Sequence, residues 1–205
     1  IPSSGEMLNP VGLGSWITFN VGRNRYMLNN SARIIKRFLS LGGQMIDSSP
    51  MYGSSEKTIG FGLDSARYPA NLFSATKTWS SSSRKGREQF SDSQQLWGLE
   101  RFDLMQIHNL MAWRDQLAML RELKQEKLVR YIGVTTSHGR RHDELLQILN
   151  EQDLDFVQLT YNISDTQAER QLIPTAMDNG IAVIANRPFQ GGNLFRYVQQ
   201  YAAPG

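Results

Sequence analysis

The stretch Asp103–Val134, DLMQIHNLMAWRDQLAMLRELKQEKLVRYIGV, decides the fold class of this chain. It opens with an apolar run typical of a buried strand, Asp103–His108, and closes with a second one, Val129–Val134. Between them, Asp115–Gln125 carries leucines at helical spacing, which predicts a helix with one apolar face. Two strands that are joined by a helix run parallel in one sheet, so this stretch predicts a parallel α/β protein.

The same alternation continues in both directions. Further strands are expected at Val11–Gly14, Gln44–Asp47, Leu72–Lys77, Phe156–Leu159 and Ile181–Ala185. Further helices are expected at Ser31–Leu41, where Asn30 or Ser31 can cap the start, and at Ser54–Gly62, Arg87–Leu99, Asp143–Leu149 and Gln167–Asp178.

Seven such strands fit either a doubly wound sheet or most of a (β/α)8 barrel. The segment Gly12–Ile17 lacks the third glycine of the dinucleotide-binding fingerprint, which disfavours the doubly wound sheet. We therefore expect a single TIM-type barrel domain over residues 1–205. Seven βα units of this barrel are visible in the sequence. The eighth strand is expected to be missing or truncated, because Gly205 follows soon after the seventh strand.

The composition is that of an ordinary globular protein, with 205 residues, 40% hydrophobic, 20% charged and a net charge of +3. The absence of cysteine excludes disulfides, thiolate chemistry and cysteine zinc sites, and three scattered histidines predict no metal site. No apolar run has membrane-spanning length, and no basic stripe with interleaved aromatics predicts nucleic-acid binding. We expect a small-molecule partner, a monomer or weak oligomer, and a cytoplasmic location. Export after removal of a signal segment is the alternative, since the chain begins at Ile1.

Three successive predicted strands end on an ionisable residue: Asp47, Lys77 and His108. Each alone is commonly structural, as a capping carboxylate, a solvated amine or a buried hydrogen-bonding ring. In a (β/α)8 barrel, however, the C-terminal ends of the strands converge on one mouth, where active sites lie. The three residues together therefore predict a catalytic group.

Tyr52 follows the second predicted strand, five residues after Asp47. A nearby lysine favours the phenolate, and a buried lysine needs a carboxylate partner to stay charged. We therefore predict that Lys77 and Asp47 lower the pKa of Tyr52 and make it a proton donor. His108 is expected to hold a carbonyl oxygen by a hydrogen bond.

These residues lie in segments that resemble the aldo-keto reductase family in order and spacing over nearly the whole chain. The matching segments are Gly12–Trp16, Ile46–Gly53, Ser55–Glu56, Ala75–Trp79, Gln106–Asn109 and Arg130–Val134. The resemblance implies a (β/α)8 barrel that binds NADPH, with NADH as the alternative, across its mouth. It also implies reduction of an aldehyde or ketone, with Tyr52 as proton donor, Lys77 and Asp47 setting its acidity, and His108 at the carbonyl oxygen.

The resemblance implies further site residues. Those for the cofactor are Gly14, Ser15, Asp47, Thr135, Gln158, Asn186, Arg187, Pro188, Phe189, Gly192 and Leu194. Those for the substrate pocket are Trp16, Tyr52, Trp79, His108 and Asn109.

The sequence departs from the family in the cofactor-binding half. Thr135-Thr136 stands where the family commonly has Ser-Asn. Asn186-Arg187 stands where an aromatic residue commonly stacks on the nicotinamide. The Arg187 guanidinium is a candidate for stacking, for the pyrophosphate or for a substrate carboxylate.

Two other readings stay open. One is a regulatory or degenerate barrel that binds the nucleotide cofactor with little or no turnover. The other is a lyase that uses Lys77 as a Schiff-base amine, which the neighbouring tyrosine and histidine disfavour.

Overall fold

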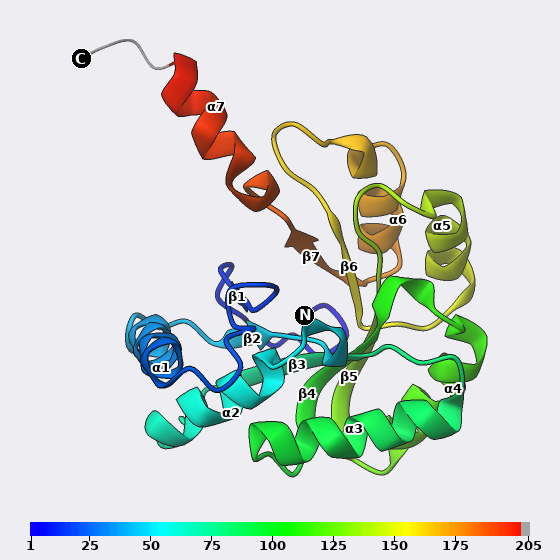
Figure 1. Cartoon of the computed structure of the whole chain (residues 1–205). Helices are drawn as coiled ribbons and strands as arrows, with labels where there is room; N and C mark the ends of the chain where they lie inside the picture. The colour runs from blue at the N-terminus through cyan, green and yellow to red at the C-terminus, as the bar shows by residue number, and fades with distance from the viewer. Residues whose placement is uncertain (202–205) are drawn as a thin grey trace.

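A computed structural model describes residues 1–201 and contains seven parallel strands in the order β1-β2-β3-β4-β5-β6-β7. The strands are β1 Leu13–Gly14, β2 Met45–Asp47, β3 Phe73–Thr78, β4 Phe102–Ile107, β5 Val129–Thr135, β6 Phe156–Thr160 and β7 Ala182–Asn186. The sheet curls, and helices follow its outer side (Figure 1). Among the described residues β1 and β7 do not pair, so the prediction of an incomplete (β/α)8 barrel is confirmed.

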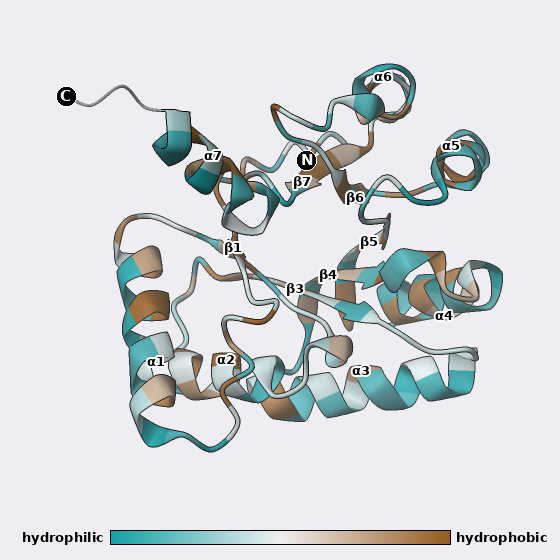
Figure 2. Ribbon diagram, turned by 45° about the horizontal axis from the view of Figure 1, so that its top comes forward, coloured by the Kyte–Doolittle hydropathy of each residue, from teal (hydrophilic) through white to brown (hydrophobic). Residues whose placement is uncertain are grey.

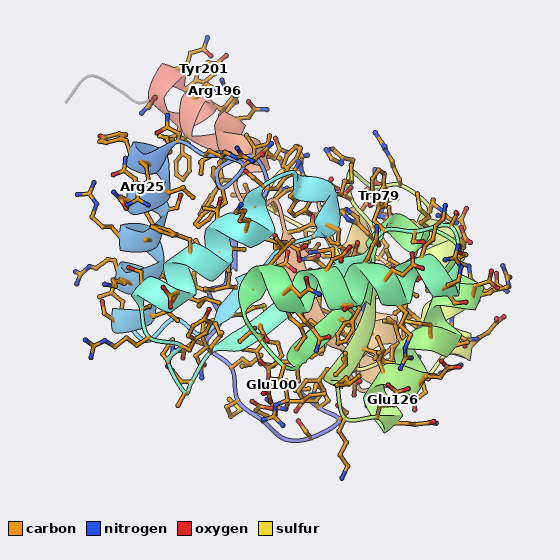
Figure 3. All side chains as sticks on the ribbon, turned by 60° about the horizontal axis from the view of Figure 1, so that its bottom comes forward. Arg25, Trp79, Glu100, Glu126, Arg196 and Tyr201 are labelled. Carbon is orange, nitrogen blue, oxygen red and sulfur yellow. The ribbon has the colours of Figure 1, made fainter. Side chains whose placement is uncertain are left out.

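Helices connect successive strands as the alternation predicts. They are α1 Arg25–Ser40, α2 Ser55–Ser65, α3 Ser83–Trp97, α4 Trp113–Gln125, α5 His142–Glu151, α6 Leu172–Asp178 and α7 Asn193–Tyr201. Short 3-10 turns lie between them: η1 Pro50–Tyr52, η2 His108–Leu110, η3 Gln167–Glu169 and η4 Gln190–Gly192. The helix α7 extends away from the sheet, as the labels on Arg196 and Tyr201 show (Figure 3).

The first helix begins earlier than the sequence pattern predicts. Ser31 was expected at or beside its start, but α1 begins at Arg25. The side chain of Asn24 accepts a hydrogen bond from the Met27 N–H at 3.1 Å and so caps the helix. Leu28 lies four residues before Ala32 and seven before Ile35, so the helical apolar spacing already begins at Leu28, and the polar run 29–31 was wrongly read as the start.

Hydrophobic side chains form two layers, one on each side of the sheet. The outer layer packs helices on strands and includes Leu117, Leu120 and Leu123 of α4, all buried as predicted. The inner layer fills the barrel and consists of Met45, Phe73, Ala75, Leu104, Tyr131 and Phe156. Hydrophobic colour accordingly concentrates on the strands, while the helices carry hydrophilic colour as well (Figure 2).

The N-terminal segment closes the end of the barrel where the strands begin. Ile1 and Leu8 pack against the inner hydrophobic layer. The Tyr131 hydroxyl hydrogen-bonds to Ser4 Oγ at 2.8 Å and to Glu6 Oε2 at 2.7 Å, and Arg130 forms an ion pair with Glu6. The N-terminal segment does not cover the opposite end, where the strands stop, so that end can hold a functional site.

Parallel pairing brings the polar strand ends together at that opposite end. The register pairs Asp47 with Ala75 and Lys77 with Gln106. Farther round the sheet, Thr135 pairs with Gln158, and Thr160 with Asn186. Within residues 1–201, no helix has the length and apolar character needed to cross a membrane.

Candidate active site

The centre of the site is an ion pair between the ends of β2 and β3. The Lys77 ammonium donates to Asp47 Oδ1 at 2.6 Å, to Asp47 Oδ2 at 2.7 Å and to the Ser48 carbonyl at 2.9 Å. Lys77 is 1% exposed, so water does not replace these partners. All three ammonium protons are therefore engaged, which argues against Lys77 as a Schiff-base nucleophile.

Residues 47 to 49 hold the neighbouring groups in place. The Ser15 hydroxyl contacts the Asp47 carbonyl at 2.9 Å and Ser48 Oγ at 2.8 Å, which ties β1 to β2. Ser49 Oγ lies 2.7 Å from His108 Nδ1. Ser48 and Ser49 are both completely buried, so their hydrogen bonds are shielded from water.

Tyr52 ends the short turn η1 and lies over the ion pair. Its ring centroid is 5.6 Å from Lys77 Nζ and 5.6 Å from the His108 ring, which it meets edge-on. Burial, together with the negative charge of Asp47, raises the pKa of Tyr52 far above its usual value. The predicted lowering was wrong, because Asp47 neutralises Lys77 and the ring is itself buried.

His108 opens the turn η2 at the end of β4. Burial, with a smaller effect from the Lys77 charge, lowers the pKa of His108 to about 3. The ring is therefore neutral at physiological pH, and one of its nitrogens carries a proton while the other does not. A neutral ring of this kind can donate a hydrogen bond to an uncharged oxygen.

A cavity of about 580 Å³ opens over these groups and lies at the strand ends. Its wall includes Asp47, Tyr52, Lys77 and His108, so the structure brings the four predicted catalytic residues together. Methyl groups added at Gly14 and Gly192, two further wall residues, would meet no atom within 4 Å. A volume of this order accommodates a small molecule or part of a cofactor.

The ends of β5 and β6 provide polar side chains to the same cavity. Thr135 Oγ1 accepts a hydrogen bond from the Asn109 N–H at 3.2 Å, and Gln158 Nε2 reaches Asp47 Oδ2 at 3.3 Å. Next to them, Thr136 Oγ1 is buried and has no hydrogen-bond partner among the described residues. Thr136 is not among the residues that line the cavity, so Thr135 and Gln158 are the polar groups that these strand ends offer to a ligand.

Asn186, at the end of β7, is held by its neighbours. Its Oδ1 accepts from Thr160 Oγ1 at 2.8 Å, and its Nδ2 donates to the Thr136 carbonyl at 3.1 Å. The side chain therefore braces the strand ends, and it lines the cavity as well.

Arg187 follows with a backbone φ of 56°, a left-handed conformation that is uncommon for arginine. Its guanidinium contacts the His138 ring. Burial, and then the charges of Arg187 and Arg140, lower the pKa of His138. Arg187, Arg140 and His138 all line the cavity, so the two guanidinium groups give this part of its wall positive charge.

The remaining predicted residues divide between the cavity and its surroundings. Ser15, Trp16, Asn109, Pro188 and Phe189 line it. Leu194 and Trp79 are not among its lining residues. Trp79 lies at the edge of the molecule, where it is 40% exposed (Figure 3). Its backbone exchanges two hydrogen bonds with Gln89 on α3, which holds it there.

Several wall residues were missed by the sequence analysis: Thr18, Met51, Ser137, His138, Arg140, Gly191 and Phe195. Most lie in loops, where no periodicity marks a side chain as facing a cavity. The position of His138 three residues after Thr135 was a usable signal, because it follows a strand end. Within residues 1–201, there is no group of three or more His, Asp or Glu side chains that could hold a metal ion.

Glu56, which belongs to the quoted Ser55–Glu56 segment, has a structural role beside the site. Its buried carboxylate accepts hydrogen bonds from Thr76, Ser93 and Trp97 at 2.6 to 3.0 Å. It thereby joins β3, α2 and α3 directly behind Lys77. Burial raises the pKa of Glu56, and these hydrogen bonds oppose that effect.

Comparisons with known proteins all point to the same family. A family model described as Aldo/keto reductase family matches residues 10–205. The chain is 30% identical over 129 residues to the NADH-specific methylglyoxal reductase of Escherichia coli (strain K12), which covers 58% of this chain and 37% of that protein. It is 24% identical over 200 residues to methylglyoxal reductase YeaE of the same organism, covering 95% of this chain and 69% of that protein. The chain thus spans little more than a third of the first relative.

Solved structures show the same fold. A crystal structure of an aldo/keto reductase from Klebsiella pneumoniae, in complex with NADP and acetate, superposes with a TM-score of 0.80 at 17% identity. The match covers 95% of this chain and 70% of that one. The thermostable aldo-keto reductase Tm1743 gives a TM-score of 0.78 at 22% identity, with 99% and 80% covered. The family match over residues 10–205 establishes that this chain belongs to the aldo/keto reductase family.

Proposed function

We propose that this protein reduces an aldehyde or ketone to an alcohol, using a nicotinamide dinucleotide as reductant. The observation that carries the proposal is the grouping of Tyr52 and His108 on one cavity wall above the buried Lys77–Asp47 pair. Tyrosine and neutral histidine are both donors that can reach one carbonyl oxygen. The names of the E. coli relatives point to methylglyoxal as the first substrate to test.

The described residues fit the nicotinamide and pyrophosphate portions of such a cofactor. Thr135 and Gln158 both line the cavity and carry a hydroxyl and an amide, so both can meet a carboxamide. Arg187 and Arg140 supply positive charge for phosphate oxygens. We propose NADPH as the cofactor, with NADH as the alternative. Bound NADP in the Klebsiella structure and the NADH specificity in one relative's name support this pair of candidates.

When bound, the reduced nicotinamide supplies a hydride to the carbonyl carbon. The raised pKa of Tyr52 keeps its hydroxyl protonated at neutral pH, so the proton needed by the oxygen is in place. As the carbonyl oxygen gains negative charge, it takes the Tyr52 proton, and the phenolate recovers one from solvent. The Lys77 ammonium, 5.6 Å from the ring centroid, stabilises that transient phenolate.

A second function is favoured by one observation. Asn186, a small amide side chain held by Thr160 and Thr136, stands in a position where the resemblance places an aromatic residue that stacks on the nicotinamide. The cofactor would then be held less firmly, and the protein would act as a nucleotide-binding barrel with little turnover.

One experiment separates the two functions. The purified protein is titrated with NADPH and with NADH while its tryptophan fluorescence is followed, since Trp16 lines the cavity. Methylglyoxal is then added and the nicotinamide absorbance is followed. Binding with steady consumption supports the reductase, and binding without consumption supports the nucleotide-binding barrel. Absence of binding by both cofactors contradicts both.

We further propose that residues 1–205 form one domain, that the protein is cytoplasmic, that it is a monomer or weak oligomer, and that it binds no nucleic acid. Cell fractionation tests the compartment, sedimentation tests the oligomeric state, and a gel-shift assay tests nucleic-acid binding.

A further inference from the structure

Ser49 connects the two residues that would contact the carbonyl oxygen. It is the N-cap of η1, the turn that ends on Tyr52, and its carbonyl accepts the Tyr52 N–H at 2.9 Å. Its hydroxyl lies 2.7 Å from His108 Nδ1. Because the side chain is completely buried, this contact is made without water.

The direction of the Ser49–His108 hydrogen bond follows from counting protons. A serine hydroxyl has one proton to donate and two lone pairs. Ser49 Oγ already accepts the Met51 N–H at 3.2 Å. In the described part of the chain, His108 Nδ1 is the only acceptor within hydrogen-bond distance of that hydroxyl. Since buried hydroxyls find an acceptor, the Ser49 proton points to Nδ1, and Nδ1 must be unprotonated.

The position of the single ring proton then follows. His108 is neutral because burial lowers its pKa to about 3. With Nδ1 accepting from Ser49, the proton resides on Nε2. Within residues 1–201, Nε2 makes no hydrogen bond, and the ring lines the cavity.

We propose that Ser49 is a positioning residue that holds His108 in the Nε2–H tautomer, ready to donate to the substrate's carbonyl oxygen. The inference rests on the proposed reductase function. In the other tautomer, Nε2 would present a lone pair to the carbonyl oxygen and repel it. The same residue caps η1, so it also sets the position of Tyr52 relative to the ring.

The neighbouring serine shows that the role belongs to position 49. Ser48 is equally buried, but its hydroxyl meets Ser15 Oγ at 2.8 Å. Its hydroxyl therefore serves the β1–β2 contact and has no part in orienting the imidazole.

The tautomer can be measured directly, without any activity. The protein contains three histidines, so ring nitrogens labelled with nitrogen-15 give a small set of NMR signals, and His108→Gln assigns those of His108. We expect Nδ1 of the wild type at an unprotonated shift and Nε2 at a protonated one. In Ser49→Ala the two shifts are expected to approach each other as the second tautomer becomes populated. A protonated Nδ1 in the wild type, or unchanged shifts in Ser49→Ala, overturns the inference.

Kinetics with NADPH and methylglyoxal give the second readout. Ser49→Ala is expected to lower kcat about tenfold, less than the roughly 10²–10⁴-fold that a positioned donor itself contributes, because the imidazole stays in place, while cofactor affinity stays unchanged. Ser49→Thr keeps the hydroxyl and is expected to restore kcat. Wild-type kcat in Ser49→Ala, or loss in Ser49→Thr equal to that in Ser49→Ala, contradicts the role.

Ser74→Ala is the matched control. Ser74 is also buried and bonds to the Asp103 carboxylate at 3.0 Å, but it lies at the opposite end of the barrel. Its loss is expected to change stability and to leave kcat unchanged. If the wild type shows no turnover at all, the proposed function fails, and the NMR measurement alone decides the role of Ser49.

Discussion

The ends of β2–β4 and the ends of β5–β7 form two halves of one cavity, and they are built differently. In the first half, Lys77 uses all three protons on Asp47 and Ser48, and His108 is held by Ser49. In the second half, the charged side chains of Arg187 and Arg140 lie at the cavity wall, and Arg187 contacts the His138 ring there rather than a carboxylate. The first half is therefore organised by ion pairing and hydrogen bonds within the protein, whereas the second half has positive charge available for a ligand.

The largest effect is expected from Tyr52→Phe, which removes the donor from the first half. We expect kcat to fall about a thousandfold, because a positioned proton donor contributes on the order of 10²–10⁴-fold. Cofactor affinity should stay the same. The exposed Tyr26 on α1 provides the control variant Tyr26→Phe. Full turnover by Tyr52→Phe would remove Tyr52 from the mechanism.

Lys77→Met tests whether the first half is organised by its ion pair. It leaves the Asp47 carboxylate, which is 13% exposed, without its cation. We expect the free energy of unfolding to fall by about 3–5 kcal/mol, the usual cost of breaking a buried pair. The measurement is urea denaturation, with kcat as a second readout.

The double variant Lys77→Met/Asp47→Asn is the control for Lys77→Met. It removes both charges, so we expect it to regain most of the stability while remaining inactive. If the double variant is as unstable as the single one, packing of the lysine stem is the cause and the charge pairing is not.

The pH dependence of stability tests the burial of His108. Its pKa in the folded protein is about 3, below the ordinary value of 6.5, so the unfolded state binds more protons between these pH values. Stability is therefore lost as the pH falls below about 6.5. At pH 5 the loss due to His108 is about 2 kcal/mol, from 1.5 pH units at 1.36 kcal/mol each. His108→Gln should lose correspondingly less stability between pH 7 and pH 5, and equal slopes in urea denaturation would contradict the shift.

The smallest effect is expected in the second half, from Arg187→Ala. Loss of one charge-assisted hydrogen bond to a phosphate, worth about 1.5 kcal/mol, should raise the Kd for NADPH about tenfold. The kcat at saturating cofactor should change little. Arg84→Ala removes an exposed arginine of α3 that pairs with Glu88, and it serves as the control. An unchanged Kd in Arg187→Ala would show that the cations at β7 do not serve the cofactor.

The sequence predicted the architecture and the first half of the site well, for a physical reason. Each of Asp47, Lys77 and His108 closes an apolar strand, and parallel pairing brings such ends together whatever the loops do. The direction of the Tyr52 pKa was wrong, because it depends on burial and on how Asp47 neutralises Lys77. Trp79 is also not among the lining residues of the cavity, since its backbone is held by Gln89, ten residues later on α3.

Ser49 was present in the quoted motif but received no role. A serine in a turn is expected to cap that turn, and Ser49 does so through Met51. Its second contact joins residues 59 positions apart in the chain. Such a contact depends on the curvature of the sheet, which no local pattern encodes.

The N-terminal segment that closes the start of the barrel has a consequence for how the chain folds. Glu6 meets Arg130 across 124 positions, and Ser3 meets Asp155 across 152. Contacts this distant in sequence form only after the intervening strands have assembled, and they slow folding through their loop-closure cost. The first residues of this chain are therefore expected to be among the last to find their place, with the inner hydrophobic layer exposed to solvent until they do.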